Sequence, residues 1–175
     1  ENIKFVITDV DGVLTDGQLH YDANGEAIKS FHVRDGLGIK MLMDAGIQVA
    51  VLSGRDSPIL RSRIADLGIK LYFLGKLEKE TACFDLMKQA GVTAEQTAYI
   101  GDDSVDLPAF AVCGTSFTVA DSPIYVKNAV DHVLSTNGGK GAFREMSDMI
   151  LQAQGKSSVF DRAQGFLKSV KNMGQ

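Results

Sequence analysis

Two aspartates separated by one residue, Asp9 and Asp11, follow a run of β-branched and aromatic residues near the start of the chain. If the strand continues through them, both side chains project from the same face. One carboxylate could then attack a phosphoryl group, while the other donates a proton to the leaving oxygen and later activates water. Gly12 follows directly, and a glycine allows the backbone to turn sharply and to come close to a ligand.

Unusual polar residues also follow two later strand-like runs. Ser53-Gly54-Arg55 comes after residues 47–52, and Gly101-Asp102-Asp103 comes after residues 97–100. In open parallel sheets, ligands bind beyond the carboxyl ends of the strands, so these residues are expected to meet Asp9 and Asp11. Clustered carboxylates repel one another unless a cation compensates, and oxygen ligands favour Mg²⁺. The sequence therefore predicts a phosphate and magnesium site.

The elements that must position these residues alternate along the chain. Short runs rich in Val and Ile predict strands at residues 3–8, 47–52, 71–73, 97–100, 116–119 and 132–134. Helical patterns lie between and after them, at residues 36–45, 57–67, 78–90, 104–113 and 141–154. This alternation is typical of an α/β fold, here a Rossmann-like parallel sheet with flanking helices.

One segment interrupts the alternation. Residues 18–21 and 27–31 resemble strands, and between them lies an Asn24-Gly25 turn signal, which predicts a β-hairpin. An isolated two-stranded hairpin is only marginally stable in water, so it must lie on its own domain or on a neighbouring chain. The second possibility predicts an oligomer.

The C-terminal segment also has an apolar face that needs a cover. Its apolar residues have near-helical spacing: Val159, Phe160, Ala163, Phe166, Leu167 and Val170. No linker divides the chain, so we expect residues 1–175 to form a single domain, with the hairpin at about 17–32 and a tail at about 156–175.

Composition excludes several classes of protein. The 175 residues are 45% hydrophobic, which is enough for one compact core. A net charge of -4 disfavours binding to nucleic acid or to anionic membranes, and the longest apolar runs are too short to span a bilayer. No signal peptide is visible, and Cys83 and Cys113 lack metal-ligand spacing. We therefore expect a cytoplasmic protein.

Each motif also has a purely structural reading. Asp9 and Asp11 could cap a strand end, and Ser53 could cap the helix that follows it. Lys79 lies in a charged run, which is usually a solvated helix face. The loop at residues 138–141 could be a flexible turn, or it could contact an anion at the start of a helix.

Taken together and in order, the motifs resemble a known family. Asp9-Val10-Asp11-Gly12-Val13, Ser53, Lys79 and Gly101-Asp102-Asp103 resemble the four motifs of the haloacid dehalogenase superfamily of phosphatases. The resemblance implies that Asp9 is the nucleophile and Asp11 the general acid and base. It implies that Ser53 hydrogen-bonds the transferring phosphoryl group, and that Lys79 neutralises this group and holds Asp9.

The same resemblance implies the metal site. Asp102 would complete it together with Asp9 and the backbone carbonyl of Asp11, while Asp103 and Asp106 would orient metal-bound waters and the lysine. Lys76 is a rival for the lysine role. We favour Lys79, because the lysine of the superfamily stands at the start of the helix after the third strand.

The short insert narrows the resemblance. About forty residues separate Asp11 from Ser53, too few for the helical cap domain of most superfamily members. The hairpin and the segments at residues 32–36 and 138–145 resemble the capless 3-deoxy-D-manno-octulosonate 8-phosphate phosphatases of lipopolysaccharide synthesis. That family implies a homotetramer with hairpins at its core and active sites completed by neighbouring subunits.

The family also implies a set of substrate contacts: Asp11, His32, Val33, Arg34, Asp35, Gly36, Lys40, Arg55, Arg63 and Lys79. The arginines make sense independently, because a sugar acid carries a carboxylate that arginine binds through two hydrogen bonds.

Three other functions remain open at this point. The same chemistry could act on a nonulosonate 9-phosphate. A phospho-accepting receiver domain also clusters aspartates, a hydroxyl and a lysine around Mg²⁺, but Asp11 and the hairpin argue against it. A non-catalytic scaffold of the same fold would have no need for intact Asp9, Lys79 and Asp102.

Overall fold

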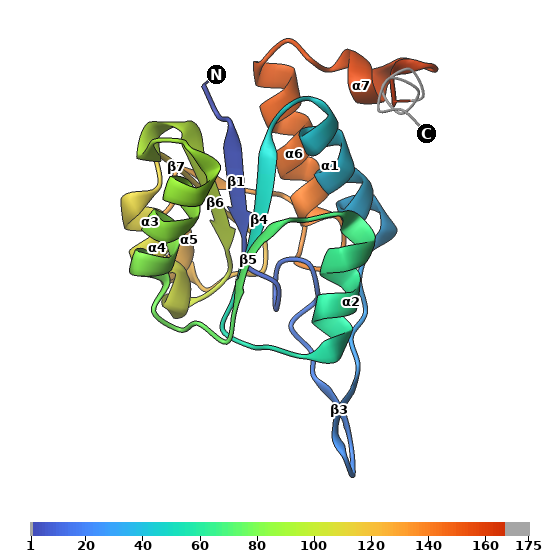
Figure 1. The fold of residues 1–175 in the computed structure, drawn as a ribbon, viewed down its shortest axis with the longest axis vertical. Helices are drawn as coiled ribbons and strands as arrows, with labels where there is room; N and C mark the ends of the chain where they lie inside the picture. The colour runs from blue at the N-terminus through green and yellow to red at the C-terminus, as the bar shows by residue number, and fades with distance from the viewer. Residues whose placement is uncertain (1, 167–175) are drawn as a thin grey trace.

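A six-stranded parallel sheet forms the centre of the computed structural model, which describes residues 2–166 (Figure 1). Its strands are β1 (Phe5–Thr8), β4 (Gln48–Ser53), β5 (Leu71–Leu74), β6 (Thr97–Gly101), β7 (Thr115–Thr118) and β8 (His132–Val133). All six predicted strands are present, with ends shifted by one or two residues. The predicted α/β fold with a parallel sheet is confirmed.

The strand order β5-β4-β1-β6-β7-β8 determines where a ligand can bind. From β1 the chain moves outward through β4 and β5, then returns to the other side of β1 as β6. Thr8, the last residue of β1, pairs with Val51 of β4 and with Ile100 of β6. Asp9 therefore leaves the sheet at the point where the strand order reverses, which is the usual ligand site of such sheets.

Helices cover both faces of the sheet (Figure 1). On one face lie α1 (Val33–Asp44), α2 (Pro58–Leu67) and α6 (Ala142–Ala153), and on the other α3 (Lys79–Ala90), α4 (Leu107–Val112) and α5 (Ile124–Lys127). The remaining elements are short: the 3₁₀ turns η1 (Ala94–Gln96) and η2 (Ser104–Asp106), and the helix α7 (Ser158–Asp161).

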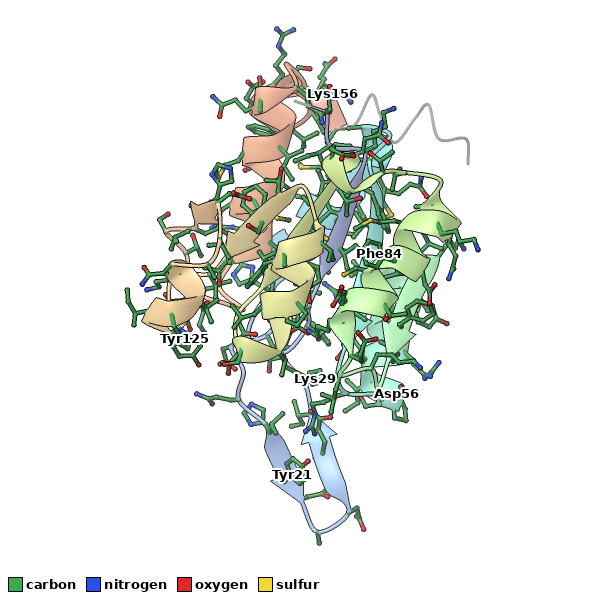
Figure 2. The ribbon with its side chains drawn as sticks, turned by 90° about the vertical axis from the view of Figure 1, so that its left-hand side faces the viewer. Tyr21, Lys29, Asp56, Phe84, Tyr125 and Lys156 are labelled. Atoms are coloured by element: carbon green, nitrogen blue, oxygen red, sulfur yellow. The ribbon has the colours of Figure 1, made fainter. Side chains whose placement is uncertain are left out.

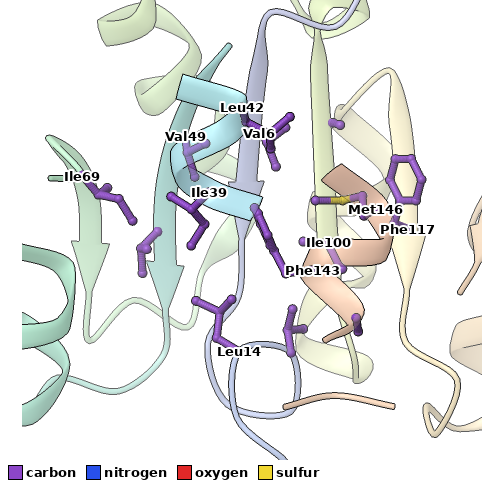
Figure 3. Packing of buried hydrophobic residues seen from close by; sticks show 14 of the residues in the cluster. Val6, Leu14, Ile39, Leu42, Val49, Ile69, Ile100, Phe117, Phe143 and Met146 are labelled. Carbon is purple, nitrogen blue, oxygen red and sulfur yellow. The ribbon is translucent and has the colours of Figure 1, made fainter. Parts of the chain in front are cut away.

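The residues of the strands alternate between the two helical layers. In β1, Phe5 and Ile7 pack with α3 and α4, whereas Val6 packs with α1 and α6. Figure 3 shows the second of these clusters, where Ile39 and Leu42 of α1 meet the sheet beside Phe143 and Met146 of α6. A strand buried on both faces in this way is held firmly, and so are the polar residues that follow its last residue.

Two predicted helices differ from the observed ones at their ends. Helix α1 begins at Val33 rather than at residue 36, because the His32 imidazole accepts a hydrogen bond from the Arg34 backbone N–H (3.1 Å) and caps the helix. The predicted helix at 104–113 is divided into η2 and α4, and Pro108 lies in the first turn of α4. The short helices α5 and α7 were not predicted.

The predicted hairpin is present and projects away from the body of the molecule (Figures 1 and 2). Its strands, β2 (His20–Asp22) and β3 (Gly25–Ile28), are shorter than the predicted arms. Tyr21 and Ile28 are 61% and 60% exposed. The part of the chain that is described therefore leaves the apolar side chains of the hairpin uncovered.

The segment after α6 returns to the body of the protein. Val159, Phe160 and Phe166 pack against the core cluster beneath α1 and α6 and are partly buried, so part of the predicted apolar face has a cover. Ala163 is exposed, and Leu167 and Val170 lie outside the described residues. No helix within residues 2–166 is both long and apolar enough to cross a membrane.

Candidate active site

A hollow of about 290 Å³ lies at the carboxyl ends of β1, β4 and β6. Six of the residues expected from the sequence line it: Asp9, Asp11, Arg55, Lys79, Asp102 and Asp103. Arg55 from the end of β4 and Asp103 from the end of β6 lie along its rim. The topology has thus brought together residues that are up to 94 positions apart in the sequence.

Asp9 lies at the bottom of this hollow and is buried. Its backbone N–H donates to the Ile100 carbonyl (3.0 Å), which continues the pairing of β1 with β6. Its Oδ1 accepts a hydrogen bond from the Val10 N–H (2.7 Å), and its Oδ2 lies 3.0 Å from Lys79 Nζ. Burial and the nearby Asp106 raise the pKa of Asp9 to about 8, although Lys79 acts in the opposite direction.

Lys79 is the first residue of α3, whose N-cap is Glu78, and its side chain is only 1% exposed. Its Nζ contacts Asp9, Asp106 Oδ1 (2.6 Å) and the hydroxyl of Tyr99 (3.1 Å). Burial alone would lower the pKa of Lys79, but the two carboxylates outweigh it and raise this pKa. Lys76, the rival, is exposed. The structure therefore places Lys79, and not Lys76, against Asp9.

Asp106 holds both Lys79 and the backbone at Asp102 and Asp103 in place. It is fully buried, and its Oδ1 accepts hydrogen bonds from Lys79 and from the Tyr99 hydroxyl (2.6 Å each). Its Oδ2 accepts from the backbone N–H groups of Asp102 (2.8 Å) and Asp103 (3.2 Å). A carboxylate has about four acceptor positions, so none is left for a metal ion. Asp106 orients the lysine and the Asp102–Asp103 turn.

Asp9 and Asp102 fit a cation. Carboxylate oxygens of Asp9, Asp102 and Asp106 lie within 4.8 Å of one another, and among the described residues no hydrogen-bond donor reaches the Asp102 carboxylate. Burial, together with Asp106 and Asp103, raises the pKa of Asp102 to about 7. A hard ion such as Mg²⁺ would neutralise these oxygens, with the Asp11 backbone carbonyl as the expected third ligand.

Gly12 makes this approach of Asp102 possible. Its backbone has φ +88°, and a Cβ at this position would lie 1.9 Å from Asp102 Oδ2. The loop at residues 138–141, for which both a flexible turn and contact with an anion were left open, packs on the other side of the same turn. A Cβ on Gly138 would lie 1.7 Å from the Gly12 carbonyl oxygen, and the Gly139 N–H donates to the Val13 carbonyl (2.9 Å).

Ser53 is the last residue of β4 and is buried. Its Oγ accepts a hydrogen bond from the Arg55 N–H (3.1 Å), so its own hydroxyl hydrogen is available to a ligand. Asp103, by contrast, is exposed, and its Oδ1 accepts from Ser104 and from the Tyr125 hydroxyl (3.1 Å). Of the two aspartates expected to orient the lysine, only Asp106 contacts it.

The other expected substrate contacts do not line the hollow of their own chain, within residues 2–166. His32 caps α1, and Asp35 is buried and accepts a hydrogen bond from the Arg144 N–H (3.0 Å) at the start of α6. Gly36 packs against Arg63, whose guanidinium lies 5.5 Å above the Phe31 ring. Val33, Arg34 and Lys40 are exposed on α1.

Three residues near the site were not predicted. Lys29 and Glu26 of the hairpin form ion pairs beside Asp11, and nothing in their strand-like arm marked them as more than surface residues. Tyr99 does carry a signal, because a tyrosine in the centre of an apolar strand needs a partner for its hydroxyl. That partner is the Lys79 and Asp106 pair.

Comparison with known proteins shows the family to which this chain belongs. The model of the haloacid dehalogenase-like hydrolases matches residues 74–146. The chain is 95% identical to the 3-deoxy-D-manno-octulosonate 8-phosphate phosphatase KdsC of Haemophilus influenzae over 175 residues, which is all of this chain and 97% of that protein. It is 42% identical to the protein of the same name from Escherichia coli K12 over 94% of this chain and 86% of the other.

Solved structures give the same result. The cobalt-bound deoxy-D-mannose-octulosonate 8-phosphate phosphatase from Haemophilus influenzae has 95% identity and a TM-score of 0.94, covering 95% of this chain and 97% of the other. The Moraxella catarrhalis phosphatase in complex with magnesium, phosphate and KDO has 38% identity and a TM-score of 0.87, covering 91% of each chain.

Fold and site thus define a haloacid dehalogenase-like hydrolase, as the sequence motifs indicated. Within that class, the chain belongs to the family of 3-deoxy-D-manno-octulosonate 8-phosphate phosphatases.

A methyl group at position 12 should disable the site. We expect Gly12→Ala to lower phosphate release about 10- to 100-fold, because its Cβ would displace Asp102. Gly46→Ala is the matched control: Gly46 has φ +84°, but a Cβ there meets nothing within 4 Å. Both variants carry the same backbone strain, so equal losses of activity in the two would contradict the role of Gly12.

The stability of the metal-free protein should depend on pH. The pKa values of Asp9 and Asp102, about 8 and about 7, lie above their ordinary value of 3.8. A carboxyl group whose pKa is raised in the folded protein stabilises the fold at pH values below its ordinary pKa. This stabilisation is lost as the pH rises through the raised pKa. The difference in melting temperature between protein in Mg²⁺ and protein in EDTA should therefore widen as the pH rises from 3.8 towards about 8. A constant difference would show that the two carboxylates do not hold the ion.

Proposed function

We propose that this chain is the phosphomonoesterase that hydrolyses 3-deoxy-D-manno-octulosonate 8-phosphate to the free sugar acid and phosphate in lipopolysaccharide biosynthesis, with Mg²⁺ as cofactor. The observation that carries the proposal is the hollow in which the buried Asp9 and Lys79 lie with the half-buried Asp102 and with Asp11, in a chain 95% identical to a phosphatase of this name. The Moraxella catarrhalis relative is described with magnesium, phosphate and KDO, which are the cofactor and both products of this reaction.

The first half of the reaction transfers the phosphoryl group to the protein. A carboxylate oxygen of Asp9 attacks phosphorus, and the bond from phosphorus to the sugar oxygen breaks. Asp11 gives its proton to that oxygen, so the sugar acid leaves as an alcohol. Lys79 and the Ser53 hydroxyl stabilise the charge on the phosphoryl oxygens, and Mg²⁺, when bound, adds positive charge there.

The second half releases phosphate. Asp11, now ionised, removes a proton from a water molecule, which attacks the phosphorus of the aspartyl-phosphate. The bond from phosphorus to Asp9 breaks, phosphate leaves, and Asp9 is again a carboxylate beside Lys79. Asp106 and Tyr99 keep the lysine in place through both halves, because each holds its Nζ from within the core.

Recognition of the sugar acid needs more than one copy of the chain in this proposal. Arg55 lines the hollow, whereas Arg34, Lys40 and Arg63 lie away from it on α1 and α2. We propose a homotetramer in which neighbouring subunits complete each active site. The exposed apolar side chains of the hairpin support this, because a second copy would cover them.

The remaining properties follow from the same proposal. A single domain of residues 1–175 would act on a small-molecule phosphate, without nucleic acid or membrane as partner. Its place would be the cytoplasm, in keeping with Cys83 and Cys113, which are buried and not bonded to each other.

Phosphate release from a panel of sugar phosphates, with and without Mg²⁺, tests the function. We expect 3-deoxy-D-manno-octulosonate 8-phosphate to be the best substrate and EDTA to abolish its hydrolysis. Asp9→Asn and Asp11→Asn should lower turnover by at least about 100-fold, while Asp66→Asn, on the exposed side of α2, should not change it. If the protein preferred a nonulosonate 9-phosphate, the proposed reaction would stand and only the proposed substrate would change. Stable phosphorylation without phosphate release would favour a receiver domain instead.

Light scattering at micromolar concentration tests the assembly. We expect the mass of a tetramer for the natural sequence and a smaller mass for Tyr21→Lys combined with Ile28→Lys, because charges would replace the apolar contacts of the hairpin. Ile124→Lys on α5 removes a side chain of similar exposure and should leave the mass unchanged. A monomeric natural protein would contradict shared active sites.

A further inference from the structure

Lys29 lies at the base of the hairpin, one residue after β3, and is buried where a lysine is ordinarily exposed (Figure 2). Its side chain is 3% exposed. Its Nζ donates a hydrogen bond to Asp11 Oδ1 (2.5 Å) and lies 3.0 Å from Glu26 Oε1. The hairpin therefore reaches the side chain of Asp11 directly.

Arg55 closes this group of charges from the other side. Its Nε lies 3.9 Å from Asp11 Oδ2, and its Nη2 lies 4.0 Å from Glu26 Oε2. The same Nη2 donates to the Tyr21 hydroxyl (3.0 Å). Two carboxylates and two cations thus alternate, and their charges balance. Lys29 already forms ion pairs with Asp11 and Glu26, and so it is not available to bind phosphate.

The contact constrains Asp11 in a specific way. The Asp11 side chain is 23% exposed, and among the described residues Lys29 is the one donor that forms a hydrogen bond with it. Oδ1 is therefore held, whereas Oδ2 has only the distant Arg55 and is free to exchange a proton. Without Lys29, no hydrogen bond from the described residues would hold the Asp11 carboxyl group, which is in part exposed to solvent.

We propose that Lys29 is a positioning residue, which holds the Asp11 carboxyl in place so that its second oxygen can pass a proton to the leaving sugar oxygen. Glu26 fixes Lys29 in turn. The inference rests on the proposed function, because it assigns Lys29 a part in the phosphatase reaction. It also means that the hairpin has a chemical task at its base, separate from any contact made by its exposed residues.

Two substrates with different leaving groups separate this role from a merely structural one. A sugar alkoxide needs a proton in order to leave, whereas p-nitrophenolate leaves well without one. We expect Lys29→Met to lower kcat/KM about 10- to 100-fold for the sugar-acid phosphate and only a few-fold for p-nitrophenyl phosphate. Lys29→Arg keeps the donor and should recover part of the loss. Lys88→Met, an exposed change on α3, is the control and should match the natural protein.

A double-mutant cycle completes the test. If Lys29 acts through Asp11, then adding Lys29→Met to Asp11→Asn should cause no further loss. Additive losses, equal losses for the two substrates, or an unaffected Lys29→Met would overturn the inference. Activity toward p-nitrophenyl phosphate shows at the same time that the variant is folded. A natural protein that releases no phosphate from either substrate would overturn the proposed function and this inference together.

Discussion

The structure depends on one unfavourable arrangement: the carboxylates of Asp9 and Asp106, which are buried, and of Asp102, which is half-buried, lie close together at the ends of two adjacent strands. The carboxylates repel one another, and burial removes the water that would solvate them. Both effects raise the pKa of Asp9 and of Asp102, which shows that Lys79 alone does not compensate these charges. Asp106 is stabilised by two donors on each oxygen, so it remains a fixed anion. The other two stay under-compensated, and this deficit creates the affinity for a cation and for the phosphate that comes with it.

The fold tolerates this deficit because the rest of the sheet is strongly stabilised. Residues of β1, β4 and β6 are buried on both faces, against α1 and α6 on one side (Figure 3) and α3 and α4 on the other. Such a core contributes the free energy that keeps like charges together. The site thus lies at the ends of strands that are packed on both faces, whereas the hairpin that reaches it projects away from the body of the molecule (Figure 1).

The sequence was sufficient for the sheet and for the residues that the strands carry into the hollow. Strand ends can be read from apolar runs, and the topology rule then brings Asp9 and Asp102 together. Lys79, the first residue of α3, was expected there only from the family resemblance. The ion pair of Lys29 with Asp11 could not be predicted, because it depends on how the hairpin leans against the body. The role of Asp35 could not be predicted either. It was expected to contact the substrate, but its carboxylate accepts a hydrogen bond at the start of α6, 109 positions away. Long-range side-chain contacts of this kind leave no local pattern.

The contact between Gly138 and the Gly12 carbonyl has a consequence for natural variation. A loop 126 positions downstream lies directly against the turn that follows Asp9 and Asp11, with no room for a single additional atom between them. A side chain at position 138 would therefore displace this turn, although Gly138 does not itself line the hollow. The site can thus be lost by a change in a loop far along the chain, even with Asp9, Asp11 and Asp102 all intact.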